Sequence, residues 1–257
     1  MGACLKRCII LNVEPQEEAL TIPYHLEELR AALLRALIGL GAAIAASLFF
    51  TNRLIDFLAR PIGGLDKLQA IEVTETVSVY MRVALLAGVI LASPWIFYQL
   101  FRYLAKGLKP EERGRVFIAV PFAVLFFAAG AVFAYLIMLP SALSFFAQFL
   151  GVQTFFRIKS YFSFVTNLIF WIGVSFELPL LVFVLARIGI VNARTLIKGW
   201  RAAVVIIAVL AAVITPTADP VNMAIFMLPL FGLYLLSIGL AALAGKKRAA
   251  DEEKQET

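Results

Sequence analysis

Six apolar runs, separated by short polar segments, constrain this chain more than any other feature of its sequence. The runs cover about Ala31–Phe50, Val77–Leu100, Val116–Met138, Tyr161–Ala186, Ala202–Ile214 and Val221–Ala244. Most of them reach the roughly 20 residues that a helix needs to cross a bilayer. Because lipid leaves no water to satisfy the backbone, such runs predict helices. The fifth run has only about 13 residues and predicts a thinned bilayer or a tucked position.

The composition agrees with a membrane environment. Hydrophobic residues make up 62% of the 257 and charged residues only 16%, with a mean hydropathy of +0.91. A water-soluble domain of this length could not cover its surface with so few charges. The sequence therefore predicts an all-α integral membrane protein: one six-helix domain over residues 25–245, between polar tails at 1–24 and 246–257. It shows no internal repeat.

Lys and Arg in the polar segments predict the orientation of the helices. Sixteen of them fall in the two tails and in the segments after the second and fourth runs, and five fall on the opposite side: Arg53, Arg60, Lys67, Arg157 and Lys159. Because positive charge collects on the cytoplasmic side, both termini are expected in the cytoplasm. The formal net charge of +6 is then a signal of topology and of contact with anionic lipid, and no nucleic-acid partner is expected.

Motifs for catalysis and for cofactors are missing from the sequence. His25 is the only histidine, and the chain contains no GxSxG, HExxH or glycine-rich phosphate loop. We therefore expect no enzymatic activity, no metal and no cofactor. Any work done by the protein must draw on a partner or on the membrane potential.

Four acidic residues stand among the basic residues of the expected cytoplasmic side: Glu27, Glu28, Glu111 and Glu112. Pro110 suits the first position of a helix, and acids in a first turn complement the helix dipole. These carboxylates can therefore be simple dipole partners on a solvated face. The alternative is that two of them share one face and bind guanidinium groups in bidentate fashion.

The fourth run contains one charged residue, in the stretch VSFELPLL. An isolated carboxyl at mid-membrane costs at least about 2.5–3.5 kcal/mol unless it faces a cavity or a partner. Glu177 is either protonated and hydrogen-bonded to a carbonyl that Pro179 frees, or it lines a concave surface and contacts a partner helix. In the second case Pro179 would bend the helix and help to form the concave surface.

Four stretches carry a resemblance to a known family: HLEELRAALLRAL, SPWIFYQLFRYLAKGLKPEERGRV, YFSFVTNLIFWIGVSFELPLL and VITPTADPVNMAIFMLPLFGLY. In this order they are similar to TatC, the core subunit of the twin-arginine protein translocase, over about residues 22–245. The resemblance implies six transmembrane helices in a concave, glove-like bundle in the bacterial inner membrane. It also implies binding of twin-arginine signal peptides of folded precursors, recruitment of single-span TatA-type and TatB-type partners, homo-oligomeric assembly, and export driven by the protonmotive force.

The resemblance assigns roles to individual residues. Glu28 and Glu112 match the signal-recognition glutamates, and their neighbours Glu27 and Glu111 fall at positions that the family does not fix. The rest of the expected signal-peptide site is His25, Leu29, Arg30 and Tyr103, with Arg30 as an orienting group. The expected intramembrane partner contacts are Glu177, Pro179, Thr215 and Asp219.

The sequence also departs from the family pattern. Lys106 stands where the family usually has proline, Tyr103 where phenylalanine is common, and Asn222 and Met223 where Ser-Gln often follows. Two other classes compete with a translocase subunit. A proton-coupled transporter would use Glu177 as its carrier, but it usually has several polar groups at the midplane, and Glu177 is the only one that we identify from the sequence. A structural scaffold would not explain two acids in matching contexts on one side.

Overall fold

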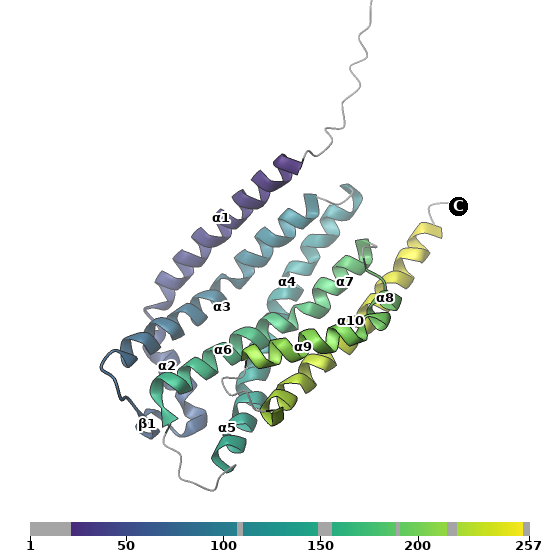
Figure 1. Ribbon diagram of the computed structural model, residues 1–257. Coiled ribbons are helices and arrows are strands. Elements are labelled where there is room, and N and C mark those ends of the chain that lie inside the picture. The colour runs from purple at the N-terminus through teal and green to yellow at the C-terminus, as the bar shows by residue number, and fades with distance from the viewer. Residues whose placement is uncertain (1–21, 107–109, 149–155, 189–190, 215–219, 254–257) are drawn as a thin grey trace, which may run out of the picture.

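The computed structural model describes residues 22–106, 110–148, 156–188, 191–214 and 220–253, and this part of the chain is almost entirely helical (Figure 1). The main helices are α1 (Ile22–Ser47), α3 (Glu75–Lys106), α4 (Pro110–Phe133), α6 (Ile158–Phe176), α7 (Leu178–Ile188), α9 (Trp200–Ile214) and α10 (Pro220–Glu253). By length and composition, five segments of the described residues can cross a membrane, and Trp200–Ala212 in α9 is a shorter apolar helix. The prediction of an all-α membrane protein with a short fifth helix is confirmed.

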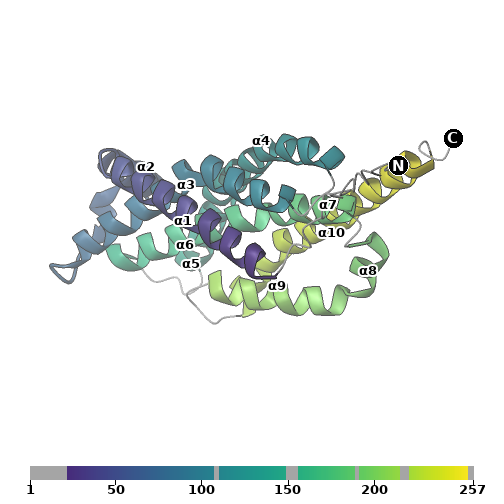
Figure 2. The same cartoon turned by 90° about the horizontal axis from the view of Figure 1, so that it is seen from above.

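Helix α1 lies at the edge of the bundle and packs along α3 (Figures 1 and 2). A close approach of the two backbones holds the pair together, since a Cβ on Gly88 would lie 2.8 Å from Cα of Ile44. Nearer the start of α1, the indole Nε1 of Trp95 donates a hydrogen bond of 3.0 Å to the carbonyl of Arg35. Most of the other face of α1 is exposed, as expected for a helix that faces lipid.

The centre of the bundle is formed by α3, α4 and α6. Helices α4 and α6 meet at two glycines, and a Cβ on Gly130 would lie 3.0 Å from Cα of Gly173 and 2.8 Å from the ring of Phe176. Small residues allow such close helix contacts. In a bilayer the hydrophobic effect does not drive helices together, so van der Waals packing at such contacts stabilises the bundle. Around this contact the buried core includes Val83, Met138, Phe162, Leu168 and Ile172.

The fourth span is broken at the acid that the sequence analysis singled out. Helix α6 ends at Phe176, α7 begins at Leu178, and Glu177 lies between them. Pro179 sits in the first turn of α7, where its missing N–H is tolerated. Leu181 donates its N–H to the carbonyl of Glu177 at 2.9 Å, so the chain resumes a helical path at once. The predicted interruption at Pro179 is confirmed as a break between two helices.

The last helices pack as a group. Helix α10 runs against α7 and α9, and α8 (Ala193–Lys198) joins α7 to α9. The hydroxyl of Tyr234 in α10 donates a hydrogen bond of 2.5 Å to the carbonyl of Leu196 in α8. Helix α10 continues to Glu253, so the segment expected as a polar tail begins as a helical extension.

The two ends of the bundle differ. Helix α1 begins and α10 ends at one end, which we call the terminal end (Figure 1). The opposite, distal end holds α2 (Thr51–Ala59), η1 (Arg60–Ile62), η2 (Leu65–Lys67) and α5 (Leu139–Gln148). There β1 (Leu68–Gln69) pairs in parallel with β2 (Phe156–Arg157). Helix α4 reaches this end through η3 (Ala134–Met138), one wide π-helical turn.

Candidate functional site

The positions of the two candidate recognition acids lie at the terminal end. Glu28 belongs to the second turn of α1, and Glu112 to the first turn of α4, which begins at Pro110 as predicted. Both helices pack against α3, whose last residue is Lys106. The two positions therefore stand on either side of the end of α3. The side chains of His25, Glu28 and Glu112 lie outside what the structure describes.

A group of aromatic side chains occupies the surface between these helices. We call Trp95, Tyr98 and Phe117 the aromatic surface: the ring centroid of Tyr98 lies 6.0 Å from that of Trp95 and 5.9 Å from that of Phe117. The Arg102 guanidinium lies 5.8 Å from the centre of the Tyr98 ring. All three aromatic residues are exposed, by 37–45%. The surface therefore offers π-faces and a cation next to the starts of α1 and α4.

Polar atoms without partners lie beneath this surface. Gln99 is 1% exposed, and neither its amide nitrogen nor its amide oxygen has a hydrogen-bond partner among the described residues. The same holds for Nη2 of Arg102. A buried polar group without a partner destabilises a fold.

The remaining residues of the predicted signal-peptide site lie on the same helices. Leu29 is 44% exposed and Arg30 is exposed on α1. Tyr103 is half-buried in the last turn of α3. Trp95, Arg102 and Phe117 were not singled out in the sequence analysis. The aromatic and basic residues crowded into SPWIFYQLFR are the signal that could have indicated them.

The intramembrane residues predicted to contact partners are only partly within the described chain. Glu177 is 7% exposed, and its Oε1 has no hydrogen-bond partner among the described residues. Pro179 is buried beside it. Thr215 and Asp219 lie outside the described residues. Glu177 is thus held inside the bundle at the break between α6 and α7.

The distal end contains an ionic cluster that the sequence analysis did not predict. Arg157 donates through Nε to the carboxylate of Glu75, whose side chain is fully buried, and through Nη2 to Glu72 at 2.7 Å. The backbone N–H of Ile71 also donates to Glu75, at 3.2 Å. The hydrogen bonds from Arg157 to Glu75 and to Glu72 raise the pKa of Arg157. Acids just before the second run and a lone arginine just before the fourth were the available signal.

A second charged residue, Arg82, lies within the candidate span Glu75–Tyr103. It stands in the second turn of α3, toward the distal end and away from the midplane. Its Nη1 donates a hydrogen bond of 2.8 Å to Oγ of Ser163 on α6. A long side chain near the end of a span can reach a polar partner in this way.

Comparison with known proteins decides the family. Residues 24–229 match the family model of the Sec-independent protein translocase protein, TatC. The chain belongs to the TatC family. The TatC protein of Koribacter versatilis is 36% identical over an aligned length of 247 residues, and the match covers 90% of this chain and 90% of that protein. The chloroplastic TatC of Pisum sativum is 34% identical, over 90% of this chain and 67% of its own length.

A solved structure of a TatC family member extends this likeness to three dimensions. The crystal structure of the twin-arginine translocase receptor TatC superimposes with a TM-score of 0.78 at 32% identity, covering 86% of this chain and 99% of the other. The chain is accordingly a multi-pass membrane component of the twin-arginine translocase, a transport protein and not an enzyme. TatC family members are found in bacteria and in chloroplasts.

Proposed function

We propose that this TatC protein binds twin-arginine signal peptides at its terminal end, with Glu28 and Glu112 as the groups that recognise the two arginines. The observation that carries the proposal is the position of both residues in the opening turns of α1 and α4, on either side of the end of α3. A guanidinium presents a rigid fork that a carboxylate binds in bidentate fashion, and lysine cannot reproduce that geometry. Two arginines on one peptide thus match two carboxylates on the helices that flank α3.

The aromatic surface supports the same proposal. Trp95, Tyr98 and Phe117 expose their rings near these helix starts, where they can cover the apolar part of a signal peptide. Gln99 and Arg102 hold polar atoms that have no partner among the described residues, and a bound peptide backbone could supply one. The proposed site also includes Leu29, Arg30 and Tyr103. His25 belongs to it from the first turn of α1.

The proposal extends to partners and to orientation. The exposed apolar residues Val205, Ile206 and Val209 on the short helix α9 offer a docking face for a single-span TatA-type or TatB-type helix. Glu177 would contact such a helix from the break between α6 and α7, and Thr215 and Asp219 would do so from the turn before α10. We place both termini in the cytoplasm of a bacterial cell, with export driven by the protonmotive force and the subunits assembled as homo-oligomers.

Binding of matched peptides to the purified membrane complex tests recognition. Loss of one charge-assisted pair should weaken binding roughly ten- to a hundredfold. We therefore expect Glu28→Ala and Glu112→Ala to reduce the affinity for an Arg-Arg signal peptide by that factor. The matched controls Glu27→Ala and Glu111→Ala should reduce it far less, and added salt should weaken wild-type binding. Equal wild-type affinity for Arg-Arg and Lys-Lys peptides would rule the proposal out.

Orientation has a separate test. A cysteine placed at Lys109 should resist a membrane-impermeant thiol reagent added to intact cells, whereas a cysteine at Gly151 should react. Labelling at position 109 from outside would contradict cytoplasmic termini.

A further inference from the structure

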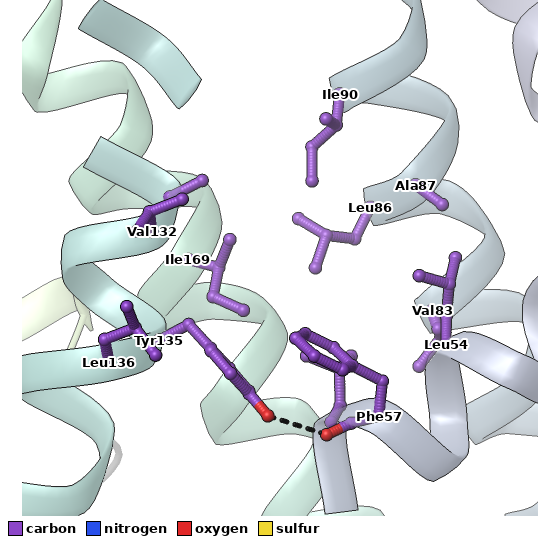
Figure 3. Close-up of a pocket in the computed structure, with 12 residues that line it drawn as sticks. Leu54, Phe57, Val83, Leu86, Ala87, Ile90, Val132, Tyr135, Leu136 and Ile169 are labelled. Atoms are coloured by element: carbon purple, nitrogen blue, oxygen red, sulfur yellow. Dashed lines mark hydrogen bonds between the residues drawn. The ribbon is translucent and has the colours of Figure 1, made fainter. Parts of the chain in front are cut away.

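Two apolar cavities lie side by side near the distal end, between α2, α3 and the α4–η3 segment. The first has a volume of about 270 Å³ and the second about 370 Å³. Leu54, Ala87 and Ile90 line both of them, so the two cavities adjoin, and we call them together the groove. Figure 3 shows Leu86 and Ile90 of α3 on one side of the first cavity, Val132 and Leu136 on the other, and Ile169 of α6 behind them.

One specific contact spans the distal end of the groove. The hydroxyl of Tyr135 donates a hydrogen bond of 2.8 Å to the carbonyl of Phe57 (Figure 3). The two rings are stacked, with centroids 4.6 Å apart. This contact ties α2 to η3 across the groove.

Positive charge lies at the same end of the groove. Arg53 lines the second cavity, and the guanidinium of Arg60 lies 5.4 Å from the centre of the Phe57 ring. Among the described residues, ion pairs form at Arg157, and neither Arg53 nor Arg60 is paired with a carboxylate. Asp56 is exposed on the same helix without joining them. Two guanidinium groups are thus available beside an apolar groove.

We propose that this groove binds one anionic phospholipid from the leaflet at the distal end, with an acyl chain along α3 and the phosphate at Arg53 and Arg60. Arginine binds phosphate oxygens in bidentate fashion, and an apolar lining within a membrane-spanning bundle suits a hydrocarbon chain. The proposal does not depend on recognition of signal peptides by Glu28 and Glu112.

The test is native mass spectrometry of the purified protein titrated with phosphatidylglycerol or with zwitterionic phosphatidylcholine. We expect wild type to bind one phosphatidylglycerol more tightly than any phosphatidylcholine. The double variant Arg53→Gln/Arg60→Gln should weaken that binding roughly tenfold. Lys67→Gln, which removes a distal charge away from the groove, should leave it unchanged, and Asp56→Asn should bind at least as tightly as wild type.

A second pair of variants tests the acyl-chain groove. Ala87 lines both cavities, so Ala87→Trp should remove the tightly bound lipid. Leu228→Trp places the same ring on an exposed position of α10, a helix that does not line the groove, and should retain it. If Ala87→Trp does not fold, lipid binding by the Arg53→Gln/Arg60→Gln variant decides, because both arginines are exposed. Equal binding of the two lipids by wild type, or an unchanged affinity in the arginine variant, overturns the proposal. The proposal also fails if Ala87→Trp folds and keeps the lipid but no longer crosslinks to a signal peptide. The groove would then be occupied by peptide.

Discussion

The two ends of the bundle differ in how completely their buried polar groups are paired. At the distal end, three tyrosine hydroxyls donate to backbone carbonyls of residues 48, 57 and 58, at 2.7–2.8 Å: those of Tyr80, Tyr135 and Tyr161. Toward the terminal end, Trp95 and Tyr234 also donate to backbone carbonyls, but Gln99 and Arg102 hold buried polar atoms without partners among the described residues. Satisfied polar groups fix one arrangement of the helices, whereas unsatisfied ones mark where another molecule completes the site. We therefore assign stability to the distal end and propose binding at the terminal end.

The largest effect on stability is expected at the distal ionic cluster. Arg157→Ala leaves the carboxylate of Glu75 buried without its partner, and removing one member of a buried pair is strongly destabilising. We expect this variant to lower Tm more than Gly130→Ala or Tyr135→Phe does, as measured by thermal unfolding in detergent. The matched control is Lys159→Ala, an exposed cation two residues away, which should change Tm little. A variant as stable as wild type that had lost signal-peptide binding would reverse the roles of the two ends.

The contact between α4 and α6 should come next. A Cβ at Gly130 would meet Cα of Gly173 at 3.0 Å and Phe176 at 2.8–2.9 Å, so Gly130→Ala forces the two helices apart. Overpacking of this kind costs about 1–3 kcal/mol of unfolding free energy. Gly232→Ala, where a Cβ meets nothing within 4 Å, should be neutral or stabilising. The comparison is made by unfolding in mixed micelles, and equal losses in both variants would exclude a steric cause.

At the terminal end we expect a substitution to leave the unfolding free energy unchanged or to raise it. Gln99 is buried with an amide that has no partner among the described residues, so Gln99→Leu removes a desolvation cost of about 1–3 kcal/mol. We expect unfolding free energy to stay constant or rise, while affinity for an Arg-Arg signal peptide falls. Thr166→Val is the opposing control, because the Thr166 hydroxyl is buried and donates to the Phe162 carbonyl at 2.6 Å. Destabilisation by Gln99→Leu would show that its amide already has a partner.

The sequence predicts the spans well because apolar length and period are local properties. The short α9, the start of α4 at Pro110 and the break beside Pro179 all follow from single residues or from composition. The cluster of Arg157 with Glu75 and Glu72 could not be predicted in the same way, because Arg157 lies 82 residues after Glu75 and 85 residues after Glu72 in the chain. The aromatic surface likewise needs α3 and α4 to be placed side by side. The side chains of Glu28 and Glu112 lie outside the described structure, so their role stays a prediction.

The smallest effect isolates one hydrogen bond at the distal end. Tyr135→Phe removes the hydroxyl that donates to the Phe57 carbonyl at 2.8 Å but keeps the stacked ring, so only the bond is lost. A single hydrogen bond contributes about 0.5–1.5 kcal/mol net. Tyr98→Phe makes the same change on the aromatic surface of the terminal end, where the ring contacts are retained, and it should cost close to nothing in unfolding free energy. The two variants are compared by unfolding under one set of conditions. Equal costs for Tyr98→Phe and Tyr135→Phe would mean that the terminal end is held together by its polar groups as firmly as the distal end, and the contrast between the ends would then fail.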